Sequence, residues 1–307
     1  MKKSALELIG NTPMVRLSRV HRGPGAIVAK AEFLQPGGSI KDRAAKAIIE
    51  AARRDNRLQP GMPVVEMTSG NMGAGLAVVC AALGHPLIVT MSAGNSPARA
   101  KMMTALGAEV VLVPQVDGNP GQVTGADLGA AIESALQLAK ERGAFYVDQF
   151  HAPEGVTAHY AGTGAEIWRQ CKGRVDAWVA AVGTGATFTG VAKALKDRTP
   201  HILAVAVEPA TSQPLAGKVV EDSRHVMQGT GYGLVPPNWD HRLMDQSIGV
   251  SDEEAEHWRN ELSRKEGLFV GYSAAANVCA ASKLLGTGIL GSDSVVATVL
   301  CDTGLKY

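Results

Sequence analysis

The chain has 307 residues, and its 30 lysines and arginines balance 29 aspartates and glutamates, so the formal net charge is only +1. At roughly 150 residues per domain, this length accommodates two domains with a substantial buried core. The balanced charge excludes nucleic acid as the main partner, because no excess positive field is present to hold a polyanion.

The cysteines indicate neither a disulfide framework nor a metal site. Four of them lie far apart in the sequence, without a CxxC pair: Cys80, Cys171, Cys279 and Cys301. Free thiols are typical of a reducing compartment. The sequence therefore predicts a cytoplasmic protein that binds no metal.

One uncharged stretch, residues 67–98, is longer than the roughly 20 residues of a membrane span. It is interrupted by His85-Pro86 and by polar residues such as Asn71, so a buried strand-helix-strand unit explains it better. At the N-terminus, Glu7 and Asn11 come before any apolar run long enough for a signal peptide. We expect neither a membrane helix nor a secretion signal.

Short apolar runs rich in Val and Ile alternate along the chain with helical patterns bounded by Gly. In chain order, the pattern predicts a helix over 44–53, a strand over 63–67, a helix over 72–83, a strand over 86–91, a helix over 97–106, a strand over 110–113, a helix over 126–142, a strand over 145–149, a helix over 157–170, a strand over 177–182, a helix over 187–196, a strand over 201–207, a loop over 228–238, helices over 252–265 and 273–285, and a strand over 295–300. Buried strands joined by helices form parallel sheets covered by helices, so the predicted fold class is α/β. No linker is evident, and two domains would be interwoven.

The first chemically informative turn is residues 36–43, Pro-Gly-Gly-Ser-Ile-Lys-Asp-Arg. We expect Ser39 to be the N-cap of the following helix, which places Lys41 in its first turn. The positive end of the helix dipole favours the neutral amine there, as a Schiff-base lysine or a general base requires. The alternative is a solvated lysine whose charge is offset by Asp42.

Two further strand-to-helix turns are suited to anions. The turn at 66–73 contains Thr68, Ser69, Gly70 and Asn71, whose hydroxyls and backbone amides suit a carboxylate or phosphate. The alternative for this turn is simple N-capping of the helix that follows.

The turn at 181–190 is rich in Gly and Thr, which lets backbone amides approach a phosphate closely. A dinucleotide fingerprint would need Gly at position 188, where the chain has Phe188, so a nicotinamide cofactor is disfavoured.

A fourth segment, residues 270–275, places Ser273 at another expected helix start. A hydrolase elbow would need Gly at position 275, and the chain has Ala275. An ordinary N-cap remains the alternative for Ser273. Two anion-binding turns and a helix-start lysine together match pyridoxal phosphate (PLP), a phosphate-bearing electron sink that needs a lysine.

The motifs also occur in an order and spacing that resembles the cysteine synthase and cystathionine β-synthase family of fold-type II PLP-dependent enzymes. They lie at residues 11–15, 36–43, 68–71, 183–187, 207–209, 228–231 and 301–304. The resemblance covers nearly the whole chain. It implies two interwoven three-layer domains with mostly parallel sheets: a larger PLP-binding domain of residues 1–42 plus 149–307, and a smaller mobile domain of residues 43–148. It also implies a homodimer.

The resemblance implies a role for each motif. Lys41 would carry the internal aldimine and shuttle the α-proton. The substrate carboxylate would be held by Thr68, Ser69, Gly70, Asn71 and Gln149, with Asn71 also touching the 3′ oxygen of the cofactor. The phosphate would be bound by Gly183, Thr184, Gly185, Ala186 and Thr187. Ser273 would face the pyridine nitrogen, where a neutral hydroxyl favours β-elimination chemistry over transamination.

The implied reaction is a ping-pong β-replacement. An O-activated serine such as O-acetylserine would lose its β-substituent to give an aminoacrylate, and sulfide would add to form L-cysteine. Met72, Ala186, Tyr232 and Tyr272–Ala275 depart from the pattern of cysteine synthases and leave both substrates open.

Several alternatives remain open. They are another leaving group, such as serine with homocysteine or O-phosphoserine, another amine or thiol nucleophile, or β-elimination by a dehydratase or desulfhydrase. A further alternative is a binding or regulatory homologue that docks the C-terminal tail of serine acetyltransferase. Docking of that tail could also be a second role of an active enzyme.

Overall fold

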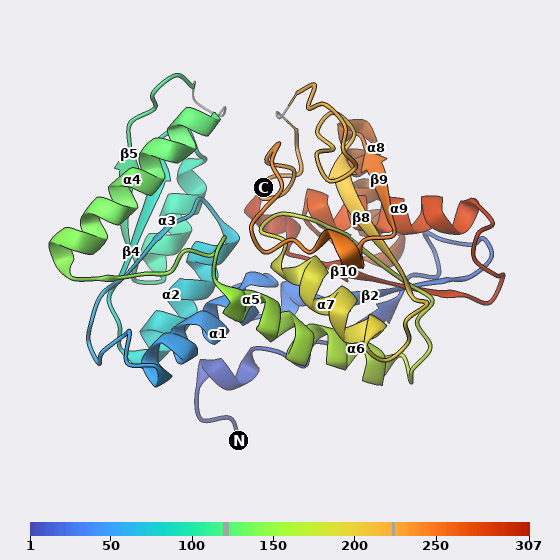
Figure 1. The fold of residues 1–307 in the computed structure, drawn as a ribbon, viewed down its shortest axis with the longest axis horizontal. Coiled ribbons are helices and arrows are strands. Elements are labelled where there is room, and N and C mark those ends of the chain that lie inside the picture. The colour runs from blue at the N-terminus through green and yellow to red at the C-terminus, as the bar shows by residue number, and fades with distance from the viewer. Residues whose placement is uncertain (119–122, 223–224) are drawn as a thin grey trace. The chain divides into compact units, whose positions relative to one another are not determined.

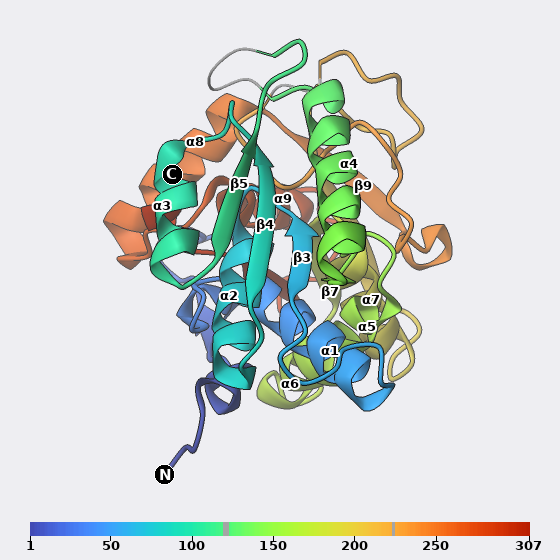
Figure 2. The same cartoon turned by 90° about the vertical axis from the view of Figure 1, so that its left-hand side faces the viewer.

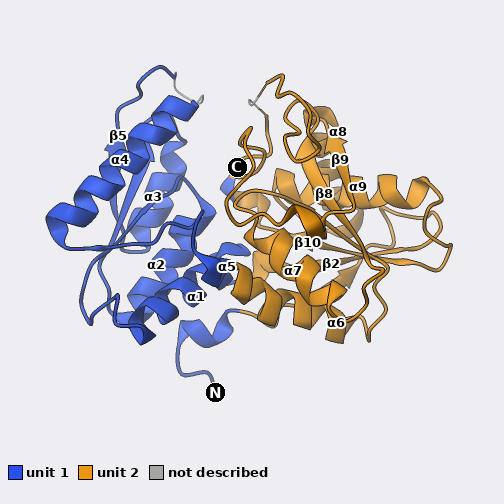
Figure 3. Ribbon diagram, in the orientation of Figure 1, with its two compact units in different colours: residues 1–9, 35–155, 306 blue, residues 10–34, 156–305, 307 orange. Residues whose placement is uncertain are grey.

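A computed structural model describes residues 1–118, 123–222 and 225–307 (Figure 1). The chain divides into two compact units, each built from separate segments of sequence (Figure 3). Unit 1 comprises residues 1–9, 35–155 and 306, and unit 2 comprises residues 10–34, 156–305 and 307. The predicted interweaving of two domains is confirmed.

Unit 1 is built on a four-stranded parallel sheet in the order β5-β4-β3-β6. Its strands are β3 (Val64–Met67), β4 (Leu87–Ser92), β5 (Glu109–Val113) and β6 (Phe145–Tyr146), and its helices are α1 (Lys41–Arg54), α2 (Asn71–Leu83), α3 (Pro97–Ala105) and α4 (Gly125–Arg142). A short 3-10 helix, η1 (Ala5–Leu8), packs against α2. Figure 2 shows β5, β4 and β3 side by side with α4 alongside them.

Helices cover both faces of this sheet because successive strand residues point to opposite sides. Val64 packs with residues of α1 and α2 in one apolar cluster, whereas Val65 packs with Ala131 and Ala135 of α4 in another. This alternation places Glu66 on the same side of β3 as Val64.

Unit 2 contains a six-stranded sheet in the order β1-β2-β10-β7-β8-β9, in which only the β1–β2 pair is antiparallel. The strands are β1 (Met14–Arg16), β2 (Ala26–Ala31), β7 (Ala177–Ala181), β8 (Leu203–Pro209), β9 (Gln246–Val250) and β10 (Val295–Leu300). The helices are α6 (Ala165–Gln170), α7 (Ala186–Lys196), α8 (Asp252–Glu261) and α9 (Tyr272–Gly286), with short 3-10 helices η2 (Glu32–Leu34), η4 (His241–Leu243) and η6 (Gly304–Lys306). Helix α5 (Pro153–Ala158) contains the boundary at residue 155.

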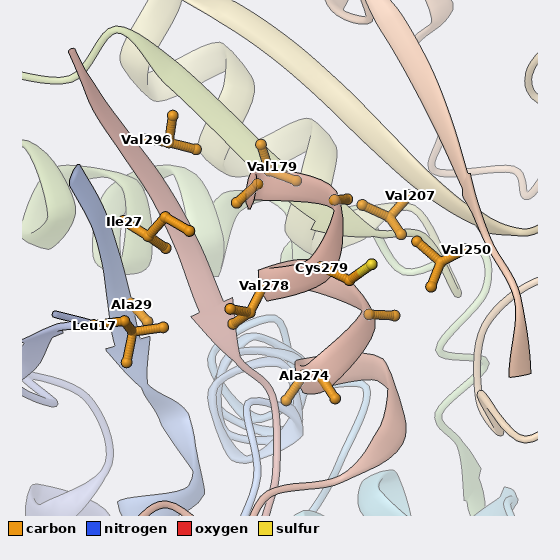
Figure 4. Packing of buried hydrophobic residues seen from close by; sticks show 14 of the residues in the cluster. Leu17, Ile27, Ala29, Val179, Val207, Val250, Ala274, Val278, Cys279 and Val296 are labelled. Atoms are coloured by element: carbon orange, nitrogen blue, oxygen red, sulfur yellow. The ribbon is translucent and has the colours of Figure 1, made fainter. Parts of the chain in front are cut away.

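The core of unit 2 forms around α9, whose small residues allow close packing against the sheet. Ala274, Val278 and Cys279 of this helix lie with Ile27 of β2 and Val296 of β10 in one cluster of buried side chains (Figure 4). Since α9 also carries Ser273, the core fixes the position of that hydroxyl-bearing turn.

Most predicted elements are confirmed to within two residues, and the exceptions have physical causes. The predicted helix 157–170 is interrupted by a π-helix, η3 (His159–Gly164), and helix 252–265 ends in another, η5 (Leu262–Glu266). An i→i+5 turn leaves no periodicity signal in sequence, and such turns are frequent at functional sites. The strand predicted over 145–149 ends at Tyr146.

Another expectation concerns the division of the chain. Residues 1–9, 35–42, 149–155 and 306 belong to unit 1, whereas the sequence prediction assigned them to the larger domain. The predicted mobility of residues 43–148 stays a prediction. Across the described ranges, no helix is both long and apolar enough to cross a membrane.

Candidate active site

The predicted site residues fall into two groups. Lys41, Thr68–Asn71 and Gln149 belong to unit 1, and Gly183–Thr187 and Ser273 belong to unit 2. In both units these residues follow the carboxyl ends of parallel strands or lie at helix starts, where ligands bind in open α/β sheets.

Lys41 is the first residue of α1. The prediction that Ser39 caps this helix is wrong, because the N-cap position is Ile40. The Ser39 hydroxyl instead accepts a hydrogen bond from the Lys41 backbone N–H, at 3.3 Å. The Lys41 residue is half-buried, and it lies at the N-terminus of α1, the positive end of the helix dipole.

The turn between β3 and α2 contains the predicted carboxylate grip. Gly70 is the N-cap of α2, and Asn71 is the first helical residue. The Gly70 N–H donates to Thr68 Oγ1 at 3.3 Å, which fixes the turn from inside. From α3, Arg99 Nη1 lies 3.5 Å from the Ser69 carbonyl oxygen and adds a positive charge beside this turn.

The starts of α1 and α2 pack directly against each other. A Cβ on Gly75 would lie 3.1 Å from both the Cα and the backbone N of Asp42, so the glycine allows the two helix starts to approach without a shift of the backbone. The Asp42 carboxylate is fully buried and accepts a 2.5 Å hydrogen bond from the Gly37 N–H. The lysine turn and the asparagine turn are thereby brought together.

Lys306 joins the same two turns through its ammonium group. Its Nζ donates to the Gly37 carbonyl oxygen and to Asn71 Oδ1, both at 2.7 Å. Because the amide oxygen of Asn71 accepts from the Lys306 ammonium, the NH2 group of the same amide points away from Lys306. Asn71 can therefore offer donors to an acceptor oxygen of a ligand.

Gln149 is anchored to the strand that precedes the asparagine turn. It hydrogen-bonds to Glu66 through its backbone and its side chain, and the Asp148 N–H donates to Glu66 Oε2 at 2.9 Å. Because β3 and β6 are adjacent and parallel, their carboxyl ends bring Gln149 close to Thr68–Asn71.

In unit 2 the glycine turn is shaped by close backbone contacts. A Cβ on Gly183 would lie 2.2 Å from the Gly229 carbonyl oxygen, and Gly185 has φ +85°. The Gly231 N–H donates to the Val182 carbonyl oxygen at 3.2 Å, so the loop at 228–231 packs onto this turn. The turn therefore depends on glycine and exposes backbone amides at the start of α7.

Thr187, in the first turn of α7, is held by a histidine from the π-helix. His159 is buried, its Nε2 lies 3.2 Å from Thr187 Oγ1, and its Nδ1 lies 2.9 Å from Thr163 Oγ1. The imidazole therefore sets the direction of the Thr187 hydroxyl.

Ser273 lies in the first turn of α9 and is 7% exposed. It is not the N-cap, which is Gly271. One turn further along, Asn277 Oδ1 accepts a 2.6 Å hydrogen bond from the Ala181 N–H, and its Nδ2 donates to the Val299 carbonyl oxygen at 2.8 Å. Asn277 thus holds the start of α9 against the ends of β7 and β10.

The helices that carry the predicted site begin differently from α4 and α8, and they share their uncapped start with α3. Within the described ranges, α1, α2, α7 and α9 have no side-chain hydrogen bond from the N-cap residue. By contrast, α4 and α8 each begin with a complete capping box, made by Thr124 with Asp127 and by Ser251 with Glu254. Helix starts without such a cap leave N–H groups available to an anionic ligand.

Three residues at the site are not identified by the sequence analysis: Glu66, His159 and Lys306. An acidic residue inside an otherwise apolar strand is a usable signal for Glu66, since buried charges are rare. No local pattern distinguishes His159 or Lys306, because their contacts depend on the tertiary fold. Among the residues that the structure describes, no group of three His, Cys, Asp or Glu is arranged to hold a metal.

Comparisons with known proteins agree with this arrangement. The profile of the family described as "Pyridoxal-phosphate dependent enzyme" matches residues 5–302. The chain is 39% identical over 306 residues to the cysteine synthase of Staphylococcus aureus strain N315, covering 98% of this chain and 94% of that protein.

Solved structures with the same fold include enzymes of different stated activities. A hydrogen sulfide-producing enzyme from Fusobacterium nucleatum matches with TM-score 0.91 and 33% identity, covering 100% of this chain and 98% of that one. A cysteine synthase from Entamoeba histolytica matches with TM-score 0.91 and 32% identity, covering 100% and 89%. An O-ureido-L-serine synthase matches with TM-score 0.90 and 33% identity, covering 100% and 93%.

Proposed function

The chain belongs to the family of pyridoxal-phosphate-dependent enzymes, and we propose that it catalyses β-replacement on O-acetyl-L-serine with sulfide to form L-cysteine. One observation carries the proposal. Lys41 and Asn71 begin two helices that pack against each other, so an amine and the turn that we propose binds the carboxylate lie together in unit 1. An amino-acid substrate needs both groups within reach of its α-carbon.

The residues present fit the cofactor. Pyridoxal phosphate supplies an aldehyde for a lysine, a phosphate for a helix start and a ring that withdraws electrons from the substrate. Lys41 would hold the aldehyde carbon. Gly183, Thr184, Gly185, Ala186 and Thr187 would hold the phosphate in a turn whose Gly183 leaves no room for a Cβ. Ser273 would face the ring nitrogen.

Lys41 would then act as the base. Its Nζ takes the α-proton of the substrate, the Cβ–O bond breaks with loss of acetate, and the sulfur of sulfide forms the Cβ–S bond. Lys41 returns a proton to the α-carbon at the end of the cycle. The start of α1 favours the uncharged amine that this role requires.

The substrate carboxylate would be bound by Thr68, Ser69, Gly70, Asn71 and Gln149. Two features support this assignment. The uncapped start of α2 offers backbone N–H groups, and Asn71 directs its NH2 away from the Lys306 ammonium. Arg99 beside Ser69 adds favourable charge.

A second reaction, β-elimination, is favoured by one specific observation. The hydrogen sulfide-producing enzyme from Fusobacterium nucleatum has the same fold over the full length of this chain. The same set of residues would serve elimination, with water rather than a new nucleophile completing the reaction. O-Ureido-L-serine synthase has similar overall likeness to this chain, so an oxygen nucleophile such as hydroxyurea is a further possibility.

We further propose the assembly and setting that go with this activity. The enzyme would act as a cytoplasmic homodimer, with residues 43–148 closing over the substrate to exclude water. No disulfide joins the four cysteines, all of which lie in the described ranges, and this supports a reducing compartment. The active site would also bind the C-terminal tail of a serine acetyltransferase, and competition between a peptide of that tail and the substrate tests this.

The deciding experiment uses purified holoenzyme and product mass spectrometry. Serine, O-acetylserine, O-phosphoserine and O-ureidoserine are each combined with sulfide, homocysteine, cyanide and hydroxyurea. Cysteine from O-acetylserine and sulfide, with little pyruvate when the nucleophile is omitted, supports the proposal. Steady pyruvate release without a nucleophile would assign elimination instead.

The lysine assignment has its own test. Borohydride reduction of the holoenzyme should attach the cofactor to the peptide containing Lys41, and Lys41→Ala should lose this adduct and about 10²–10⁴-fold in rate. Lys46→Ala, on the same helix, is the matched control and should keep both. A cofactor found on another lysine would contradict the assignment.

A further inference from the structure

Ser273 carries a hydroxyl whose direction depends on the backbone of its turn. The residue is 7% exposed, and among the residues that the structure describes its hydroxyl has no hydrogen-bond partner. Gly271, the N-cap of α9, has no side chain with which to hold the start of the helix. A hydroxyl rotates to suit whatever partner its backbone brings within reach. What holds residues 269–272 therefore decides where the Ser273 oxygen lies.

Arg259, in the last turn of α8, holds this segment on one side. Its Nε donates to the Val270 carbonyl oxygen at 3.1 Å, and its Nη1 and Nη2 donate to the Tyr272 hydroxyl and the Gly304 carbonyl oxygen, each at 3.4 Å. The guanidinium carbon also lies 4.6 Å from the ring centroids of both Phe269 and Tyr272. A planar cation that faces two aromatic rings, with its donors in a rigid fork, restricts the geometry of the groups it contacts.

The segment that follows β10 holds the same turn on its other side. The Gly271 N–H donates to the Asp302 carbonyl oxygen at 3.1 Å, and the Gly304 N–H donates to the Phe269 carbonyl oxygen at 3.0 Å. Asp302 is 1% exposed, and its Oδ2 accepts from the Tyr307 hydroxyl at 2.7 Å. A Cβ on Gly271 would lie 2.2 Å from Asp302 Oδ1, so a capping side chain there would have to displace a buried carboxylate. The start of α9 is therefore held by its surroundings and not by a cap of its own.

We infer that Arg259 is a positioning residue that directs the Ser273 hydroxyl toward the ring nitrogen of the bound cofactor. The inference rests on the proposed role of Ser273. The contacts from the segment after β10 to Gly271 and Phe269 are made by backbone groups, whereas Arg259 acts through its side chain. Without the guanidinium, residues 269–272 are held on one side, and the hydroxyl at the start of α9 samples other directions. Arg259 itself needs no contact with the cofactor.

The first test is a double-mutant cycle of Arg259→Met and Ser273→Ala, read as cysteine formation from O-acetylserine and sulfide by the holoenzyme. Arg259→Met should lower kcat by about tenfold, the effect of one misplaced hydrogen bond. KM should change by less than about twofold, because Ser273 would face the cofactor and not the substrate. In the Ser273→Ala background the same change should cost nothing further, because the hydroxyl that Arg259 directs is already absent.

Arg264→Met, an exposed arginine of η5, is the matched control and should keep the parent kcat. Losses that simply add in the double variant would overturn the inference, because an arginine that only stabilises the fold acts with or without the hydroxyl.

The second test needs no turnover. Holoenzyme carrying ¹⁵N-labelled cofactor is compared by NMR, because the chemical shift of the ring nitrogen responds to a hydrogen bond at that atom. Arg259→Met should move the shift in the same direction as Ser273→Ala, and Arg264→Met should leave it unchanged. An unchanged shift in Arg259→Met would overturn the inference whatever the substrates prove to be, so its failure is separate from failure of the proposed function.

Two milder variants keep the inference testable if Arg259→Met does not fold. Arg259→Lys keeps the charge but not the planar fork, so kcat and the ring-nitrogen shift should change as in Arg259→Met. Tyr272→Phe keeps the ring and removes the hydroxyl that accepts from Arg259 and donates to Glu256, so it should give a smaller loss that again disappears in Ser273→Ala. Parent values of both kcat and the shift in Arg259→Lys would overturn the inference, because charge alone would then suffice.

Discussion

Lys306 Nζ lies 2.7 Å from Asn71 Oδ1, a contact between residues 235 positions apart in sequence. The same ammonium binds the Gly37 carbonyl oxygen at 2.7 Å, so one cation connects the lysine turn with the asparagine turn. This contact sets which end of the Asn71 amide faces a ligand.

Replacing Lys306 should therefore weaken carboxylate binding. A hydrogen bond to a charged group contributes about 1.5–3 kcal/mol, so Lys306→Met should raise the dissociation constant of propionate, an unreactive carboxylate, by about tenfold or more, measured on the holoenzyme by cofactor fluorescence. Lys306→Arg keeps the charge and should restore most of the affinity. Lys101→Met, an exposed lysine of α3, is the control, and equal affinities for all three variants would contradict the role of Lys306.

The glycine turn should be intolerant of a methyl group. In Gly183→Ala the new Cβ would lie 2.2 Å from the Gly229 carbonyl oxygen, so the turn must shift. Overpacking of this kind costs about 1–3 kcal/mol, which predicts cofactor affinity lowered by about 10–100-fold in equilibrium dialysis. Gly286→Ala, whose methyl meets no described atom within 4 Å, should bind the cofactor as the parent does.

The His159–Thr187 contact should appear as a coupling in cofactor affinity. His159→Leu and Thr187→Val each remove one partner of the 3.2 Å contact, so the double variant should lose less than the sum of the two single losses. The expected coupling is about 0.5–1.5 kcal/mol. Strictly additive losses would show that the histidine acts only through the packing of the π-helix.

Glu66 should make the stability of the fold depend on pH. Its pKa is raised from 4.5 to about 8, so the folded protein keeps a proton that the unfolded chain releases. The contribution of Glu66 to stability is fully present below pH 4.5, decreases as the pH rises, and is lost once the pH passes about 8.

Glu66→Gln should remove this dependence. The difference between the two unfolding free energies, measured by urea denaturation, should change by up to about 1.4 kcal/mol per pH unit within that window. A difference that stays constant with pH would mean that Glu66 is ionised in the folded protein.

The sequence was sufficient to predict the parallel α/β architecture because buried strands and Gly-bounded helices have distinct periods. It did not indicate β1, β2 or β9. Strands β1 and β9 are only three and five residues long and are not uniformly buried, and β2, with six mostly buried residues, was missed as well. The π-helix at His159 was also missed, because the residues around it have ordinary helical propensity.

Most candidate site residues could be selected from sequence because they lie in local strand-to-helix turns, as Lys41 and Asn71 do. Ser39 shows the limit of such reasoning: its hydroxyl does bind the Lys41 N–H, but the helix begins one residue later than a serine cap requires. Lys306 and Glu66 act through partners distant in sequence, and no local pattern reports those contacts.

The open helix starts have a consequence for how this protein matures. Whereas α4 and α8 cap their own first turns, the N-cap residues of α2, α7 and α9 make no side-chain hydrogen bond, so we expect a bound ligand to accept hydrogen bonds from the first N–H groups of these helices. Bound pyridoxal phosphate would then cap the N-terminus of α7 in addition to taking part in the reaction. Heat resistance should rise with its free concentration, since a ligand that binds only the native state draws the unfolding equilibrium toward it.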